Sequence, residues 1–172
     1  ILPGGDPQSI LAVAKRTVRV QDEGSQLAAL LLTRMSPLAA AERVWDMCAG
    51  PGGKTALLAA ESGQVGATVL ASEISAHRAT LVEDSTSGVV ARFPGTVEVE
   101  VSDSSVVRED RFHRILLDAP CSGLGALRRR PEARWVKTRE SIAELTTLQG
   151  SLLRTGLNCL VPGGRLAYVT CS

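Results

Sequence analysis

The chain has 172 residues, enough for one domain with a sizeable core, and its 44% hydrophobic and 22% charged residues are ordinary for a soluble globular protein. No apolar run reaches the length of a membrane span, and the first residues lack the basic-then-apolar pattern of a signal peptide. Four widely spaced cysteines form no C-x-x-C pair, which speaks against a zinc site or a disulfide framework and favours a cytoplasmic protein with free thiols.

The net charge of +1 is distributed unevenly along the chain. Segment 108–139 has nine Lys or Arg and four Asp or Glu, a local charge of +5, so the remainder sums to −4. A basic segment in a mildly acidic domain suggests a localised anionic partner, with nucleic acid the leading candidate. On charge alone, a solvated charged face is about as good an interpretation. The arginines expected to contact phosphates are Arg128, Arg129, Arg130 and Arg134.

Strand-like and helix-like segments alternate along the chain. Residues 1–42 are predicted to be a lead-in segment, with a short strand at 18–20 and a helix over 26–35 capped by Asp22 or Ser25. Residues 43–172 are predicted to be the cofactor-binding and catalytic core of the same single domain. Its predicted strands are 43–47, 67–73, 96–101, 112–117 and 165–169, and its predicted helices are 54–62, 75–90 and 141–160.

This alternation, with apolar strands throughout, predicts a Rossmann-like, doubly wound α/β fold with a mostly parallel sheet covered on both faces. The chain begins at Ile1 instead of Met and stops at Ser172, directly after a strand-like run. We therefore expect it to be a piece of a longer protein, truncated after the fifth strand.

The first strand leads straight into the glycine turn 48–54, which is followed by good helix formers. A phosphate-binding P-loop would need Gly where Cys48 stands, and a dinucleotide fingerprint would need its third Gly where Thr55 stands. With both motifs excluded, the turn is better suited to a ligand that carries less phosphate than a nucleotide or dinucleotide. An acidic residue, Asp46, lies next to this turn. That acid could attract a cation such as S-adenosylmethionine, although a plain strand-to-helix turn would also explain a lone glycine cluster.

Acidic residues follow successive strands of the predicted sheet. Glu73 lies twenty residues beyond Gly53, where doubly wound folds place an acid that binds ribose hydroxyls. Asp103 and Asp118 end the third and fourth strands in the same way. Each acid singly could be a helix cap. Together with Asp46 they suggest a site that binds an adenosine and tolerates a positive charge.

Two cysteines follow the last two predicted strands. Cys121 and Cys171 would lie at one rim of the sheet if the strand order is 3-2-1-4-5. A thiolate that adds to carbon 6 of a pyrimidine makes carbon 5 reactive toward a methyl donor, and a second residue must then help to remove the carbon 5 proton. The alternative for each cysteine is burial as a small apolar residue, which we expect for Cys159. For Cys48 we favour a structural role in the turn.

Four blocks of the chain resemble the signatures of a known family, the Sun/Fmu RNA cytosine-5 methyltransferases. The segment 20–25 is similar to that family's block ahead of the first strand. The resemblance implies a class I methyltransferase fold, S-adenosylmethionine as cofactor and RNA as partner, ribosomal in preference to transfer RNA. The blocks are Asp46-Met-Cys-Ala-Gly-Pro-Gly-Gly-Lys-Thr55, Leu117-Asp-Ala-Pro-Cys-Ser-Gly-Leu-Gly125, Arg128-Arg-Arg-Pro-Glu-Ala-Arg-Trp135 and Tyr168-Val-Thr-Cys-Ser172.

The same resemblance implies residue roles. Cys171 is the expected nucleophile, Cys121 assists product release and Asp118 contacts the target base. Gly50 stands where the family usually has Ala. A monomer without metal or membrane contact is expected. The alternatives are a methyltransferase of another substrate and a catalytically silent RNA-binding protein. The residues expected to contact the cofactor are Cys48, Ala49, Gly50, Pro51, Gly52, Gly53, Lys54, Glu73, Arg78, Asp103 and Asp118.

Overall fold

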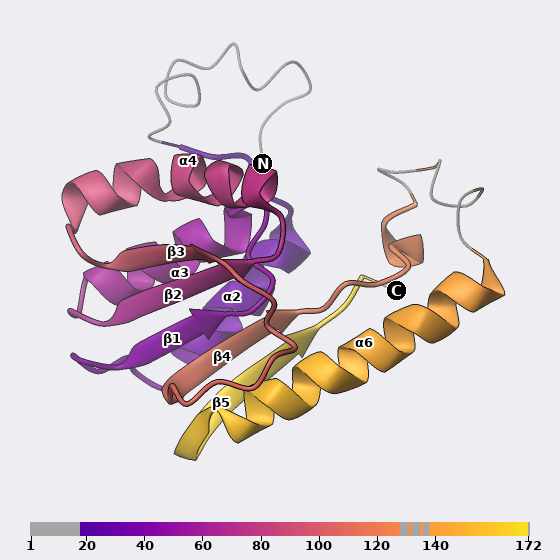
Figure 1. Cartoon of the computed structure of the whole chain (residues 1–172). Helices are drawn as coiled ribbons and strands as arrows, with labels where there is room; N and C mark the ends of the chain where they lie inside the picture. Colours follow the sequence, from indigo (N-terminus) through magenta and orange to yellow (C-terminus); the bar gives the residue numbers. More distant parts are fainter. Residues whose placement is uncertain (1–17, 128–130, 132–134, 136–137, 172) are drawn as a thin grey trace.

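A parallel sheet of five strands, in the order β3-β2-β1-β4-β5, organises the part of the chain that the structure describes (Figure 1). The structure is a computed structural model and describes residues 18–127, 131, 135 and 138–171. The predicted doubly wound α/β fold is confirmed. The strands are β1 (Arg43–Asp46), β2 (Thr68–Glu73), β3 (Val97–Val101), β4 (Phe112–Asp118) and β5 (Leu160–Val169), and the helices are α2 (Glu23–Arg34), α3 (Gly53–Gly63), α4 (Ala76–Arg92), the short η2 (Leu124–Ala126) and α6 (Arg139–Asn158).

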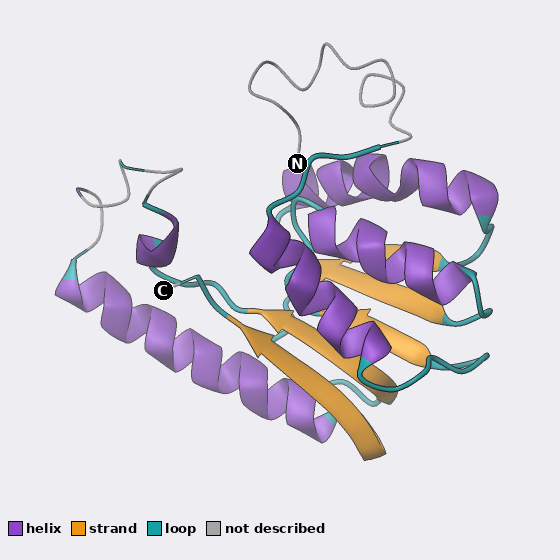
Figure 2. Cartoon of the chain, turned by 180° about the vertical axis from the view of Figure 1, so that it is seen from behind, coloured by secondary structure: helices purple, strands orange, loops and turns teal. Residues whose placement is uncertain are grey.

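Helices cover both faces of the sheet. Helices α2, α3 and α4 lie on one face, and α6 runs along β4 and β5 on the other (Figures 1 and 2). Successive strand residues enter different cores: Val44 and Leu116 pack with residues of α2 and α3, whereas Trp45 and Ile115 belong to the cluster that contains Leu152 of α6. Because both faces of the sheet are covered, β1, β2 and β4 are mostly buried and largely apolar, whereas β3 at the edge alternates valine with glutamate.

Two sequence predictions near the N-terminus need correction. Residues 18–20 form no strand, and α2 begins at Glu23 instead of residue 26. The reason is the cap: the Asp22 carboxylate accepts a hydrogen bond from the Ser25 N–H at 3.3 Å, so the supposed turn is the first turn of the helix.

The last strand is longer than predicted. The predicted strand covers 165–169, whereas β5 starts at Leu160 and runs through the Pro-Gly-Gly segment 162–164. The pairing with β4 shifts register there, from Phe112 opposite Leu160 to Arg114 opposite Arg165. A bulge on a strand at the edge of the described sheet accommodates both proline and glycine.

Arg114 on β4 is almost completely buried, with 1% of its surface exposed. Its guanidinium donates to the carbonyl oxygens of Leu32, Thr33, Ser36 and Pro37, at 2.8 to 3.3 Å, and to the Glu42 carboxylate at 2.6 Å. These carbonyls lie at the C-terminal end of α2 and just beyond it, where a helix leaves acceptors unpaired. One side chain therefore fixes the end of α2 to the sheet.

Across the described residues, none of the helices combines the length and hydrophobicity that a membrane span requires.

Candidate active site

The predicted acids meet at one edge of the sheet. Asp46, Glu73 and Asp118 are the last residues of β1, β2 and β4, and Asp103 lies two residues beyond β3. Parallel strands have their carboxyl ends on the same side, where ligands of open α/β sheets bind. The four acids nevertheless differ sharply in environment.

Asp46 is buried, with 1% exposed, and is not the open anion that the sequence suggested. Its Oδ2 accepts a hydrogen bond from the Thr55 hydroxyl at 2.7 Å, and its buried Oδ1 has no such partner among the described residues. Burial raises the pKa of Asp46 to about 7, although the Thr55 hydrogen bond lowers it. The hydrogen bond between Thr55 and Asp46 joins the end of β1 to the first turn of α3. Sequence reasoning missed Thr55, which a helix-starting Gly-Lys-Thr could have indicated.

Glu73 joins the glycine turn to β2. Its side chain, 2% exposed, accepts hydrogen bonds from the N–H groups of Gly50 and Ser75, both at 3.0 Å. Arg78 Nη2 lies 3.5 Å from Glu73 Oε2 and also donates to the Gly50 carbonyl. A Cβ atom added to Gly50 would lie 2.7 Å from Arg78 Nε and also against the Glu73 carboxylate. Glycine at this position thus matches the way Arg78 closes over the turn.

Gly52 is required for packing, independently of any ligand. Its φ is 99°, and an added Cβ would lie 2.5 Å from Ser85 Cβ and 2.8 Å from Val82 Cα in α4. The Ser85 hydroxyl also donates to the Pro51 carbonyl at 2.8 Å. Gly53 differs, because an added Cβ would meet only Gln21, in ordinary contact at 3.5 Å.

The remaining parts of the turn serve the fold in similar ways. Ala49 is buried and donates its N–H to the Ser72 carbonyl at 3.0 Å, which joins the turn to β2. Cys48 is partly exposed, and burial raises the pKa of its thiol to about 12.

Asp103 is exposed, and its carboxylate accepts the Ser105 N–H at 2.8 Å within its own turn. Asp103 follows Ser102, whose N–H donates to the Glu73 carbonyl at 3.1 Å, so it lies near the end of β2 although its own carboxylate bonds only within its turn among the described contacts.

Lys54 and Asp118 form an ion pair across the edge. The Lys54 Nζ atom lies 2.6 Å from Asp118 Oδ2, with the lysine side chain 15% and the aspartate side chain 36% exposed. The pair joins the start of α3 to the end of β4 and holds the Asp118 carboxylate just before the cysteine loop.

The structure brings the two predicted catalytic cysteines together. The Sγ atoms of Cys121 and Cys171 are 2.9 Å apart, although the residues are fifty positions apart in the chain. Backbone hydrogen bonds connect their loops: the Gly125 N–H donates to the Cys171 carbonyl at 2.6 Å, and the Ala119 N–H to the Val169 carbonyl at 2.9 Å. Cys159 is instead fully buried, as predicted.

Each thiol of this pair changes the acidity of the other. Partial burial would raise the pKa of Cys121, but hydrogen bonds from the Cys171 side chain and backbone, the Thr170 side chain and the Gly123 backbone outweigh it and lower this pKa to about 7. The pKa of Cys171 is raised, by burial and then by the thiol of Cys121. The pair therefore favours a thiolate on Cys121 and a proton on Cys171 at neutral pH.

This acidity predicts a pH profile for alkylation. The thiolate is the reactive form, so the iodoacetamide reaction of Cys121 should rise with pH and level off above about 7, while Cys48 stays unmodified. Peptide mapping by mass spectrometry from pH 5 to about 9 measures both rates. In Cys171→Ala the midpoint should move up toward the ordinary thiol value of about 8.5. An unchanged midpoint in that variant would mean that Cys171 does not set the acidity of Cys121.

Two further residues support the site without having been predicted. Gln149 of α6 donates its side-chain N–H to the Pro120 carbonyl at 2.7 Å, next to Cys121. The buried Ser104 hydroxyl donates to the Met47 carbonyl at 2.6 Å, beside the glycine turn. Nothing in the local pattern marks either residue, because each acts on a segment far away in the chain.

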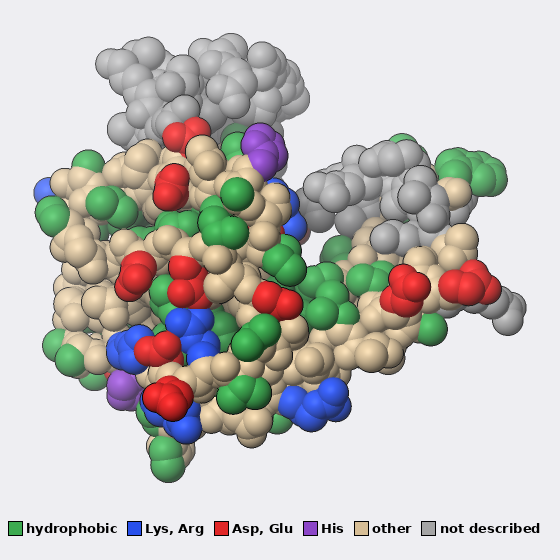
Figure 3. Space-filling model, viewed as in Figure 1, with side chains coloured by type: hydrophobic (Ala, Val, Ile, Leu, Met, Phe, Trp, Pro, Cys, Tyr) green, Lys and Arg blue, Asp and Glu red, His purple; other side chains and the backbone are tan. Residues whose placement is uncertain are grey.

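The basic segment is not a uniform surface. Arg114 is the buried anchor of α2, and Arg108 is paired with Glu100 and Asp110 at 2.6 and 2.9 Å. On the face in Figure 3, acidic and basic side chains lie next to one another. The four arginines predicted to contact phosphates, Arg128, Arg129, Arg130 and Arg134, lie outside the described residues.

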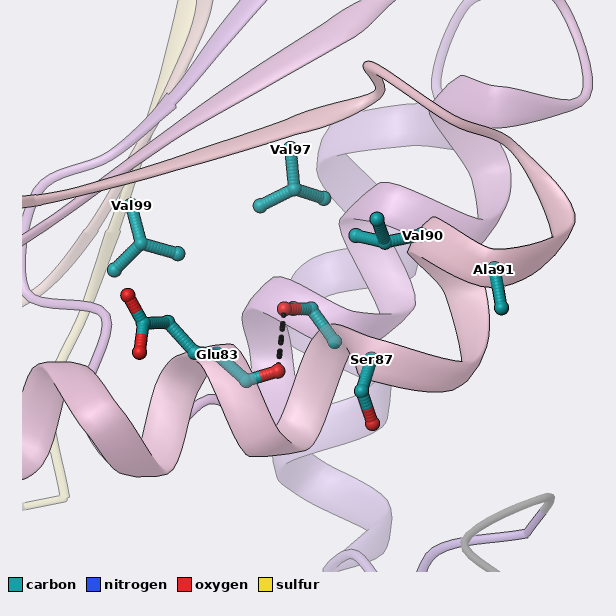
Figure 4. Close-up of a pocket in the computed structure, with 7 residues that line it drawn as sticks. Glu83, Ser87, Val90, Ala91, Val97 and Val99 are labelled. Carbon is teal, nitrogen blue, oxygen red and sulfur yellow. Dashed lines mark hydrogen bonds between the residues drawn. The ribbon is translucent and has the colours of Figure 1, made fainter.

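A hollow of about 500 Å³ lies between α4 and β3 (Figure 4). It is lined mainly by apolar side chains such as Val90, Val97 and Val99, and by none of the residues predicted for the site.

No group of three or more His, Cys, Asp or Glu side chains in the described part of the chain could hold a metal ion.

Comparison with known proteins identifies similar sequences and structures. A model of the family "16S rRNA methyltransferase RsmB/F" matches residues 34–172. The chain is 46% identical to the Mycobacterium tuberculosis protein Rv1407 over 172 residues, covering 99% of this chain and 36% of that protein. It is 39% identical to ribosomal RNA small subunit methyltransferase B of Pseudomonas putida, covering 97% of this chain and 37% of that enzyme. The chain thus spans just over a third of the length of these curated relatives.

Solved structures share the fold. The crystal structure of PH0851 is 31% identical, with a TM-score of 0.85 over 99% of this chain and 38% of that chain. TrmN from Thermus thermophilus is 22% identical, with a TM-score of 0.56 over 86% of this chain and 39% of that chain, a likeness that concerns the fold alone.

Proposed function

The chain belongs to the RsmB/F family of 16S rRNA methyltransferases, and from this membership we propose that it transfers a methyl group from S-adenosylmethionine to carbon 5 of cytosine in RNA, with ribosomal RNA as the substrate. The family expected from the signature blocks is thereby confirmed. One observation carries the finer proposal: Cys121 and Cys171, 2.9 Å apart, follow the neighbouring strands β4 and β5, and Asp118 is the last residue of β4. Two adjacent thiols suit a reaction in which one adds to the base and the other helps to release it.

In the proposed reaction each thiol has its own step. A thiolate on Cys121 takes the proton of Cys171, and the resulting Cys171 thiolate adds to carbon 6 of the cytosine. S-adenosylmethionine supplies an electrophilic methyl group, which carbon 5 of the activated ring accepts. Once Cys121 has passed its proton to water, it can accept the carbon 5 proton. The electrons of that C–H bond then restore the ring double bond and expel Cys171 as a thiolate.

Asp118 is the proposed contact to the target base. Its carboxylate stands at the end of β4, only three residues before Cys121, and Lys54 holds it in place at 2.6 Å. A fixed carboxyl group at the end of β4, just before the loop of Cys121, can hydrogen-bond to the ring nitrogen or the exocyclic amine and stabilise the adduct.

The carboxyl edge of β1 and β2 fits an adenosine cofactor. Glu73 is fixed by backbone N–H groups and can accept hydrogen bonds from ribose hydroxyls, while Ile74, 68% exposed, offers an apolar surface to a base ring. The buried, unpaired Oδ1 of Asp46 leaves an acceptor at the same edge. We assign to the cofactor site the residues Cys48, Ala49, Gly50, Pro51, Gly52, Gly53, Lys54, Glu73, Arg78, Asp103 and Asp118.

Glu73→Ala should weaken S-adenosylmethionine binding about tenfold or more, since hydrogen bonds to a charged group contribute roughly 1.5–3 kcal/mol. Isothermal titration calorimetry on the full-length protein measures the affinity. Glu98→Ala, which removes an exposed carboxylate from β3, is the matched control and should bind normally. Equal affinities for wild type and both variants would remove Glu73 from the cofactor site.

Bisulfite sequencing tests the reaction itself. RNA from cells with and without the full-length protein is compared, because 5-methylcytosine resists the conversion that ordinary cytosine undergoes. We expect one or more ribosomal RNA cytosines to become convertible when the protein is removed, and to be protected again when it is restored. A protected cytosine that is lost only from transfer RNA would change the proposed substrate. If no cytosine in either RNA class changes, the cytosine-5 proposal is wrong.

A further inference from the structure

The two catalytic thiols lie unusually close for groups that the proposed reaction uses one after the other. Their Sγ atoms are 2.9 Å apart, and a disulfide bond needs about 2.0 Å. We propose that Cys121 and Cys171 are also an oxidation site, at which a peroxide joins them in a reversible disulfide that stops methyl transfer. The disulfide depends on the geometry alone, whereas the inhibition rests on the proposed function.

The backbone keeps the thiols at this distance. Hydrogen bonds from Ala119 to Val169 and from Gly125 to Cys171 join the two loops on either side of the pair. Gln149 holds the carbonyl of Pro120, immediately before Cys121, from α6. The thiols therefore meet without any large rearrangement, and only the last 0.9 Å or so must be closed by side-chain movement.

Oxidant can reach the pair. Cys171 is exposed and Cys121 partly exposed, so neither thiol is enclosed by the core. At neutral pH Cys121 has substantial thiolate character, and the thiolate is the form that peroxides oxidise.

The reaction balances with peroxide as the only oxidant. The Cys121 thiolate attacks one oxygen of hydrogen peroxide, breaks the O–O bond and forms a sulfenic acid, with hydroxide as the leaving group. The sulfur of Cys171 then attacks Sγ of Cys121, forms the S–S bond and displaces hydroxide, which takes up the Cys171 proton as water. The hydroxide of the first step takes up the proton that Cys121 released when it ionised, so the two thiols lose two electrons and two protons in total and the peroxide is reduced to two molecules of water.

The other two cysteines of the chain, Cys48 and Cys159, serve as internal controls for the oxidation. Burial raises the pKa of Cys48 to about 12, so its thiolate is scarce at neutral pH. Cys159 is fully buried, with its Sγ 3.7 Å from the Arg108 carbonyl. Both should stay reduced under conditions that oxidise Cys121 and Cys171.

The test treats the full-length protein with hydrogen peroxide, alkylates the remaining thiols after unfolding in denaturant, so that buried thiols also react, and maps tryptic peptides without reduction. The expected product is peptide 115–128 linked to the peptide that starts at Leu166, with the loss of two hydrogens. Dithiothreitol should separate them, while peptides 44–54 and 155–165 remain alkylated throughout. In Cys171→Ser, dimedone should instead trap a sulfenic acid on Cys121.

Activity measured on the same samples separates this inference from the proposed function. Methyl transfer should fall in proportion to the linked fraction and return with dithiothreitol. If Cys121 goes on to the sulfinic acid without linking to Cys171, the oxidation site is wrong. If the link forms but methyl transfer continues, the site stands, while the inhibition and the catalytic role of the pair both fail. If the reduced protein methylates nothing, the proposed function fails, and the peptide map still decides the disulfide.

Discussion

Replacing Cys171 with alanine is expected to abolish both methyl transfer and any covalent complex with RNA. The proposed reaction begins with the addition of this thiolate to carbon 6, so without it carbon 5 never becomes reactive. The measurement uses the full-length protein with S-adenosylmethionine and its RNA, a radiolabelled methyl group for transfer and denaturing gels for the covalent complex. Because Cys171 is exposed at a strand end, its truncation should leave the fold intact.

Replacing Cys121 should have a different outcome at the same site. Turnover should also stop, but the methylated adduct should accumulate, because no thiolate remains to accept the carbon 5 proton. Loss of Cys121 also removes a group that raises the pKa of Cys171, so the nucleophile ionises more easily on its own. The gel should therefore show this variant linked to RNA, and the band should vanish in Cys121→Ala/Cys171→Ala.

Two results would contradict this assignment. If Cys171→Ala rather than Cys121→Ala retains RNA on the gel, the two roles are exchanged. If neither variant retains RNA although the wild type methylates it, the covalent mechanism is wrong, and methylation of another substrate atom becomes the better explanation.

The largest effect on stability is expected at Arg114. Arg114→Met leaves the Glu42 carboxylate and the carbonyls at the end of α2 without their donor, and breaking a buried ion pair of this kind costs about 3–5 kcal/mol in unfolding free energy. Lysine should restore only part of the loss, because an ammonium cannot reproduce the planar set of guanidinium donors. Guanidinium chloride unfolding measures the difference.

Arg165→Met is the matched control for this prediction. Arg165 lies beside Arg114 in the β4–β5 pairing but is exposed, so its truncation should change the unfolding free energy by less than about 0.5 kcal/mol. Equal effects at the two positions would show that the buried network contributes little.

The sequence predicted best those features that a short run of neighbouring residues determines. The glycine turn, the acids at the strand ends and the cysteines after the fourth and fifth strands follow from apolar runs and their boundaries, and the structure has them at one edge of the sheet. Strand order also followed, since it is common to doubly wound folds. Glu73 was predicted as a ligand of ribose hydroxyls, and its hydrogen bond from the Gly50 N–H is an addition from the structure.

Contacts between residues far apart in the chain could not be predicted from the sequence. Arg114 was counted with the basic segment, and only the packing of α2 on β4 shows that it is buried. Asp46 looked like a surface acid, because its burial depends on α3 folding back over β1. The 2.9 Å approach of Cys121 to Cys171 is accompanied by hydrogen bonds between their two loops, which join segments far apart in the chain.

The buried Asp46 also makes folding a proton-binding reaction. Its pKa rises from an ordinary 3.8 to about 7, so between these values the folded chain holds a proton that the unfolded chain has released. With more protons bound in the folded state, the contribution of this group to stability is fully present below the lower value. It is lost as the pH rises through the higher one. Refolding in a weakly acidic, lightly buffered solution therefore takes protons from the medium on account of this carboxyl group.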